Sequence, residues 1–146
     1  MNYKSVRILA LAAAAAAVTL ICVANPDAVQ AESRHMKANI PFDFHVGGRS
    51  FPAGTYTVRL IANTVIQVQD QAGNAWMTEM SVPVWSDDRY PNSRLVFNRY
   101  GDDHFLSQVL WRGYNQGQGL IKSSLEREAA KNSIETLRTV AASTNQ

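Results

Sequence analysis

Residues 40–60 read IPFDFHVGGRSFPAGTYTVRL, and this stretch decides the fold. Apolar side chains occupy every second position on either side of a middle rich in glycine and proline: Ile40, Phe42, Phe44 and Val46, then Tyr56, Val58 and Leu60. This alternation predicts β-strands that each bury one face. Gly47-Gly48 and Pro52-Ala53-Gly54 predict tight turns, because glycine accepts positive φ and proline fixes its own φ. The stretch therefore predicts consecutive antiparallel strands.

The same two signals, alternation and turn residues, continue through most of the chain. Strands are predicted over 40–46, 49–51, 55–61, 65–69, 75–85, 94–100 and 104–111, with polar turns or loops between them. Pro41 cannot donate a backbone hydrogen bond, so the first strand is expected to lie at an edge or to bulge there. About seven short strands at this spacing predict an all-β fold, a small antiparallel sandwich or partly open barrel.

The pattern changes towards the C-terminus. Residues 113–119 hold three of the eight glycines and predict a flexible connector. Ser123 and Glu126 match a capping box, the pattern that opens an α-helix. We therefore predict three consecutive regions, namely a β domain over 32–122, one C-terminal α-helix over 123–140 and a disordered tail over 141–146.

The N-terminus carries the features of a secretory signal peptide. Two basic residues precede an apolar run over 8–24, and Val29-Gln30-Ala31 places small residues where a signal peptidase cleaves. These features predict that residues 1–31 are removed and that the mature protein is exported to the periplasm or the extracellular space. Two alternatives stay open. One is an uncleaved membrane anchor, although the run is shorter than the roughly 20 residues of a spanning helix. The other is a lipoprotein signal at Cys22.

Composition and charge narrow the function classes. Cys22 is the only cysteine, so the mature chain is expected to form no disulfide, use no thiolate nucleophile and bind no zinc through cysteine. From Glu32 onward, 115 residues carry 12 basic and 11 acidic side chains, a net charge of +1. Such a small charge argues against nucleic acid as the main partner. We expect one domain with no cofactor and with no membrane span after signal cleavage.

Several short motifs resemble those of an uncharacterised family of small exported all-β bacterial proteins. They are PFDF at 41–44, PAGTYTV at 52–58, LVFNRYG at 95–101 and FLSQ at 105–108. The match covers roughly residues 36–131. The resemblance implies export and an all-β fold. Because the family has no assigned activity, the resemblance implies no catalytic residues.

The best functional indication is a group of aromatic residues in the second half of the chain. Trp85, Tyr90, Trp111 and Tyr114 stand in or beside predicted loops, where exposed rings stack on sugar rings or on partner side chains. They form the candidate binding surface. The leading hypothesis is a non-enzymatic binding or structural module whose partner is a polysaccharide or a protein of the cell envelope. The alternative interpretation is that these rings fill the core.

An enzyme is the alternative function, a hydrolase or a metal-assisted enzyme that uses clusters of Asp and His at strand ends. The residues are Asp43 with His45, and Asp102 with Asp103 and His104. A carboxylate beside an imidazole can support general-base chemistry or a metal site. No familiar catalytic motif accompanies these clusters, and their ordinary interpretation is a solvated strand face and a polar turn. The enzyme hypothesis requires the two clusters to meet in a cleft.

Overall fold

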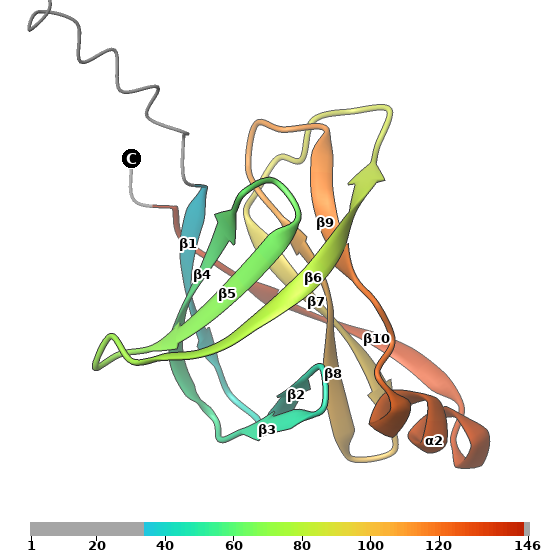
Figure 1. Cartoon of the computed structure of the whole chain (residues 1–146). Helices are drawn as coiled ribbons and strands as arrows, with labels where there is room; N and C mark the ends of the chain where they lie inside the picture. The colour runs from blue at the N-terminus through green and yellow to red at the C-terminus, as the bar shows by residue number, and fades with distance from the viewer. Residues whose placement is uncertain (1–33, 145–146) are drawn as a thin grey trace, which may run out of the picture. The chain divides into compact units, whose positions relative to one another are not determined.

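Ten strands and one helix make up the part of the chain that the computed structural model describes, residues 34–144 without the side chains of Ala75 and Trp76 (Figure 1). In chain order they are β1 (His35–Ile40), β2 (Phe44–Val46), β3 (Arg49–Phe51), β4 (Gly54–Ile61), β5 (Val65–Asp70), β6 (Ala75–Trp85), β7 (Arg94–Tyr100), β8 (Asp103–Leu110), β9 (Gln116–Leu120), α2 (Ser124–Asn132) and β10 (Glu135–Ala141). The predicted signal peptide, residues 1–31, lies outside the described residues. Within 34–144, no helix is both long and apolar enough to cross a membrane.

The strands form one open sheet with two halves. The first half has the order β1-β4-β5-β6 and the second has the order β6-β9-β8-β7-β10, with antiparallel neighbours throughout. The long strand β6 joins the halves, because its first part pairs with β5 and its last five residues, Ser81–Trp85, pair with β9. The short β2–β3 hairpin is attached to β8 by a parallel contact between His45 and Phe105.

A single antiparallel bridge brings the two outer ends of this sheet together. The backbone of Lys37 in β1 exchanges two hydrogen bonds, of 2.8 and 2.9 Å, with that of Ser143, two residues beyond β10. No continuous ladder closes the sheet among the described residues. The predicted fold class is therefore confirmed: residues 34–144 form an open all-β fold with one helix near the C-terminus.

Aromatic and aliphatic side chains from both halves of the sheet fill the interior. The ring of Phe44 is central, with centroid distances of 5.3 Å to Phe51, 5.1 Å to Tyr56 and 5.6 Å to Phe97. The buried aliphatic residues around it are Met36, Ile40, Val46, Val58, Ile66, Val68, Leu95, Leu106 and Val109. Burial of each large apolar side chain contributes about 1.5–3 kcal/mol, so this core is the main source of stability.

The prediction of a helix over 123–140 is wrong beyond its first half. α2 ends at Asn132, and residues 135–141 form β10, which pairs antiparallel with β7. The backbone of Ser133, the C-cap, is already extended, with φ −147° and ψ 150°. β-branched residues favour the extended backbone that follows: Thr136, Thr139 and Val140. The helix therefore ends just before the segment whose residues favour an extended backbone.

The two ends of the C-terminal segment illustrate what local signals can predict. The helix begins as the capping box indicates, because the backbone N–H of Glu126 donates to Ser123 Oγ at 3.1 Å. The predicted disordered tail over 141–146 is instead ordered in part, since Ala141 ends β10 and Ser143 bonds to β1. Residues 145–146 lie outside the described residues.

The predicted flexible connector over 113–119 is largely strand β9. A Cβ atom at Gly117 would overlap the side chain of Leu110, and one at Gly119 would lie 2.8 Å from Val84 Cγ2. The glycines therefore provide space for neighbouring side chains rather than flexibility. Together with β1 and β10, β9 accounts for the difference between about seven predicted strands and the ten described.

Candidate functional site

The loops that follow β6 and β8 meet at one end of the sheet. The backbone N–H of Tyr90 donates to the carbonyl of Tyr114 at 2.8 Å, and the N–H of Tyr114 donates to the carbonyl of Trp111 at 3.3 Å. Trp85 ends β6, directly before the first of these loops. All four residues of the predicted aromatic surface therefore come from the same end of the protein.

Their side chains differ sharply in exposure. Trp85 is 66% exposed, whereas Trp111 is 1% exposed and belongs to the main core. Tyr90 is 8% exposed and packs in a small second cluster of apolar residues. The predicted four-residue binding surface is therefore wrong for Trp111 and Tyr90. Of the four, Trp85 alone is a largely exposed ring.

Strand alternation explains why Trp111 is buried. Val109 points into the core, and the side chain two positions further along an extended chain points the same way. The side chain of Trp111 therefore points into the core, as that of Val109 does. The alternation of apolar residues in the sequence already indicated this orientation. Tyr114 is half-buried, and the guanidinium of Arg34 lies over its ring at 4.1 Å from the centroid. One face of Tyr114 is thus already covered within the protein.

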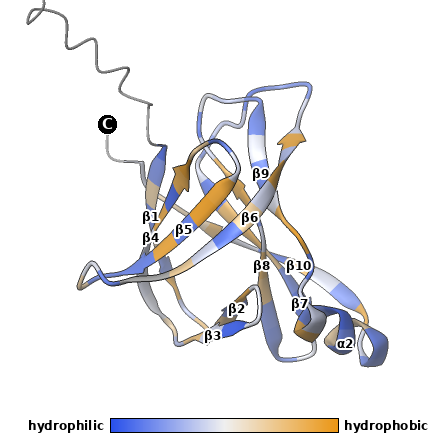
Figure 2. Ribbon diagram, in the orientation of Figure 1, coloured by the Kyte–Doolittle hydropathy of each residue, from blue (hydrophilic) through white to orange (hydrophobic). Residues whose placement is uncertain are grey.

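Trp85 lies at the end of a strand segment with a single ladder partner. Among the described residues, 82–85 of β6 pair with β9 alone, and Trp85 stands opposite Gln116. Met80 and Val82 are also exposed, on the face of β6 opposite to Trp85. Figure 2 shows the end of β6 as a hydrophobic part of the ribbon. An exposed apolar segment of this kind is a candidate contact surface.

The second predicted site, the Asp and His clusters, is partly assembled. His45 Nε2 lies 3.8 Å from Asp103 Oδ1, and His45 Nδ1 forms a 3.0 Å hydrogen bond with Ser50 Oγ. The imidazole stacks on Phe105 with centroids 4.6 Å apart. The parallel contact between β2 and β8 brings these residues together. The His–Asp distance exceeds a hydrogen bond, so this contact is electrostatic and requires a protonated imidazole.

The other members of the two clusters lie elsewhere. Asp43 Oδ1 accepts a hydrogen bond from the backbone N–H of Ala53 at 2.8 Å and so fixes a turn. Asp102 is fully exposed in the turn before β8. His104 is buried and stacks on Phe42, with centroids 4.0 Å apart. The structure therefore brings together one residue from each cluster, not the five that the enzyme hypothesis used.

His104 occupies an unusual environment for a histidine. It is 6% exposed, and neither ring nitrogen has a hydrogen-bond partner within the described part of the chain. Burial lowers the pKa of His104, the guanidinium groups of Arg138 and Arg99 lower it further, and the backbone and carboxylate of Asp102 oppose part of this shift. Arg138 also lies 4.8 Å from the centroid of the Phe42 ring. His104 is therefore neutral near pH 7.

Sequence reasoning missed a polar cluster that holds α2 against the sheet. The buried carboxylate of Glu126 accepts a hydrogen bond from Asn98 Nδ2 at 2.8 Å. The hydroxyl of Tyr100 donates to Glu135 at 2.6 Å and accepts from Lys122 Nζ at 2.8 Å. Lys122 also pairs with Glu135 at 2.6 Å, and this hydrogen bond lowers the pKa of Glu135. These partners lie far apart in the chain, so no local pattern could reveal them.

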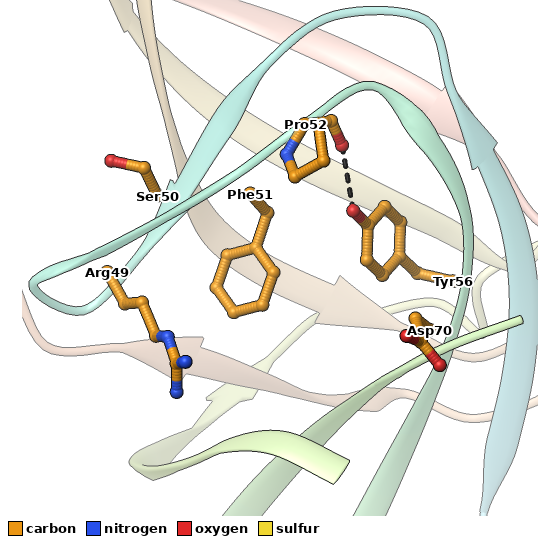
Figure 3. A pocket seen from close by; sticks show the side chains of 6 residues that line it. All are labelled: Arg49, Ser50, Phe51, Pro52, Tyr56 and Asp70. Atoms are coloured by element: carbon orange, nitrogen blue, oxygen red, sulfur yellow. Dashed lines mark hydrogen bonds between the residues drawn. The ribbon is translucent and has the colours of Figure 1, made fainter. Parts of the chain in front are cut away.

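A shallow pocket of about 260 Å³ opens beside the β2–β3 hairpin (Figure 3). It is lined by Arg49, Ser50, Phe51, Pro52, Tyr56 and Asp70. The hydroxyl of Tyr56 donates to the carbonyl of Pro52 at 2.8 Å. The carboxylate of Asp70 accepts from the backbone N–H and the side-chain amide of Asn74, at 3.0 and 3.1 Å. These polar groups stabilise the turns around the pocket.

Within residues 34–144, His, Cys, Asp and Glu side chains do not gather in any group of three or more that could hold a metal ion. Comparisons of the chain with models of protein families, with curated proteins and with solved structures find no match. The resemblance to a family of small exported proteins therefore stays a prediction. Functional inference rests on the geometry of the chain itself.

Proposed function

We propose that this protein is an exported, non-enzymatic binding module that contacts a polysaccharide or a protein of the cell envelope through Trp85. The observation that carries the proposal is the exposure of the indole, two-thirds of which faces solvent at the end of β6. Tryptophan is enriched at interaction hot spots, and its ring stacks well on flat apolar surfaces such as sugar rings.

The surroundings of Trp85 support such a contact. Pro83, two positions before Trp85 and therefore on the same face of β6, is also exposed. Among the described residues, 82–85 have a ladder partner on one side only, but Pro83 has no backbone N–H and limits pairing of this edge with another strand, so the contact is expected to be made by side chains. From Glu32 onward, the net charge is only +1, so apolar contact and hydrogen bonds, not electrostatic attraction, would supply the affinity.

Retention on insoluble material tests the proposal. The protein, expressed with its own leader and then purified, is mixed with envelope fragments or with insoluble polysaccharides, and the pelleted fraction is measured. Trp85→Ala is expected to weaken retention by about thirtyfold or more, because loss of a hot-spot tryptophan costs about 2 kcal/mol or more. Leu137→Ala is the matched control, since Leu137 is equally exposed but lies on β10.

Two results would contradict the proposal. One is the absence of retention on every material tested, and the other is an equal loss in Trp85→Ala and Leu137→Ala. Export is tested separately by N-terminal sequencing of protein recovered from the periplasm or the medium. The expected first residue is Glu32, and recovery of an intact Met1 in the cell interior alone would contradict export.

A hydrolytic enzyme is the second candidate, and one observation favours it. Ser50, His45 and Asp103 stand in series, with contacts of 3.0 and 3.8 Å on the two sides of the imidazole. A serine hydrolase needs a neutral imidazole that takes the hydroxyl proton and a carboxylate hydrogen-bonded to that imidazole, so catalysis would require Asp103 to come closer to His45 than the present 3.8 Å. A fluorophosphonate probe is then expected to label Ser50 in the native protein and to fail in His45→Gln. An unlabelled native protein would eliminate this candidate.

A further inference from the structure

A cleft of about 210 Å³ separates α2 from the outer face of β8. The sheet contributes His45, Asp103 and Phe105 to its lining, and the helix contributes Leu125, Glu128 and Ala129. Figure 1 shows α2 beside the end of the sheet where β7 and β8 turn. The cleft is smaller than the roughly 300 Å³ at which pockets for drug-sized ligands begin, so it suits a single long side chain.

The cleft exists because α2 docks through polar contacts. Glu126 is the helix residue buried against the sheet, where Asn98 binds its carboxylate. A helix that packs on a sheet normally buries its apolar residues. Leu125 is instead 44% exposed. Figure 2 shows α2 as mostly hydrophilic. The helix thus leaves Leu125 facing the cleft without a complete set of packing partners.

Carboxylates stand at the rim of this apolar space. Asp103 has one ion-pair neighbour among the described residues, His45, at 3.8 Å. Glu128 pairs with Lys131 at 2.7 Å, which offsets part of its charge. Asp103 therefore places a carboxylate at the rim that attracts cationic groups and disfavours carboxylate and phosphate groups.

We infer that the cleft receives a lysine side chain of a partner polypeptide. Lysine combines a flexible methylene stem, which can lie along Leu125, with a compact ammonium group that can reach Asp103. Arginine also has an apolar stem and a positive tip, but its planar guanidinium is broader than the compact ammonium group of lysine. The inference does not depend on the proposed contact through Trp85, which lies on a different strand.

Titration with short peptides, followed by amide signals in NMR spectra of the ¹⁵N-labelled protein, tests the inference. The probe is acetyl-Gly-Gly-Lys-Gly-Gly-amide, with norleucine or glutamate replacing lysine in two comparison peptides. The lysine peptide is expected to bind at millimolar concentrations and to shift the signals of Phe105, Leu125 and Glu128. The norleucine peptide, which keeps the stem without the charge, is expected to bind about three- to tenfold more weakly, and the glutamate peptide not to bind.

Substitutions of the carboxylates near the cleft distinguish specific binding of lysine in the cleft from general attraction to negative charge. Asp103→Asn is expected to weaken binding of the lysine peptide by about three- to tenfold. Asp102→Asn is the matched control, because its carboxylate is adjacent in sequence but lies near Arg99, at 3.7 Å. Equal effects of the two variants, equal binding of the norleucine peptide, or signals that shift only outside the cleft would each overturn the inference. Trp85→Ala is expected to leave the affinity for this peptide unchanged, and a weaker affinity would show that the two sites are not distinct.

Discussion

Replacing His104 with phenylalanine is expected to stabilise the protein. Phenylalanine keeps the aromatic contact with Phe42 and removes two buried ring nitrogens that lack hydrogen-bond partners within the described residues. An unpaired buried polar group costs about 1–3 kcal/mol, so its removal stabilises the folded protein. The slightly larger ring of phenylalanine crowds its neighbours and cancels part of this stabilisation. We therefore expect the free energy of unfolding near pH 7.5 to rise by about 1–2 kcal/mol, which corresponds to roughly 4–8 °C in Tm.

The pH dependence of the same variant provides an independent check. Burial and the two neighbouring arginines lower the pKa of His104 in the folded protein below its ordinary value of 6.5. Between these two pKa values the unfolded chain binds a proton that the folded protein does not. The free energy of unfolding of the native protein therefore falls as pH drops below about 6.5, by at most about 1.4 kcal/mol per pH unit, and levels off below the folded pKa. His104→Phe lacks this proton, so its advantage is expected to grow as pH falls.

Urea unfolding at several pH values between about 5 and 8 measures both effects. His104→Gln is the control, because it cannot titrate but leaves a buried amide and loses the ring contact. It is expected to lack the pH dependence of His104 and yet to be less stable than His104→Phe at every pH. His35 and His45 are present in all three proteins, so the differences between them report on position 104. A destabilised His104→Phe near pH 7.5, or a pH slope equal to that of the native protein, would refute the reasoning.

Three further perturbations probe the core, the close strand contacts and the polar cluster. Trp111→Ala is expected to lower the free energy of unfolding by about 3–5 kcal/mol, whereas Trp85→Ala changes it by less than about 0.5 kcal/mol, and denaturant unfolding of both variants measures the contrast. Gly117→Ala is expected to cost about 1–3 kcal/mol, because the new Cβ overlaps Leu110, and thermal unfolding checks this value. The pKa of Glu135 is lowered in the folded protein, so its stabilising effect is present above about pH 4.5 and is lost as pH falls through the folded pKa. Glu135→Gln is therefore expected to reduce the dependence of the urea midpoint on pH between about 5 and 3.

Much of the β framework was predictable because its signals act over a few residues. The strand predicted over 94–100 matches β7, and the strand predicted over 55–61 matches β4 except for its first residue. In these segments the alternation of apolar and polar residues and the positions of the turn residues predict the same strands that pair in the sheet. β10 was missed because a capping box marks where a helix begins and not where it ends. Its pairing partner, β7, lies much earlier in the chain, and no local pattern indicates that ladder.

The candidate sites were less predictable than the framework, for a related reason. Trp85 is the last residue of β6 and Trp111 directly follows β8, so both stand between a strand and a loop. They differ because β6 ends on a segment that pairs with β9 alone, whereas the residue after β8 continues the inward face set by Val109. The inward orientation of Trp111 was predictable from strand alternation. The exposure of Trp85 depends on which strands stop short of it, and only the tertiary structure determines that.

Three consecutive residues at the start of β8 explain why a polar motif on a strand does not define a site. Successive side chains on a strand point to opposite faces, so His104 enters the buried space beneath Phe42 while Asp103 and Phe105 line the outer cleft. Asp103 and His104 therefore face different spaces, whereas Asp103 and Phe105, two apart, share one face with His45 of the neighbouring strand. By that rule His45 and Asp103 are the pair from which any chemistry of these clusters must start. His104, although it belongs to the same motif, controls stability and its pH dependence instead.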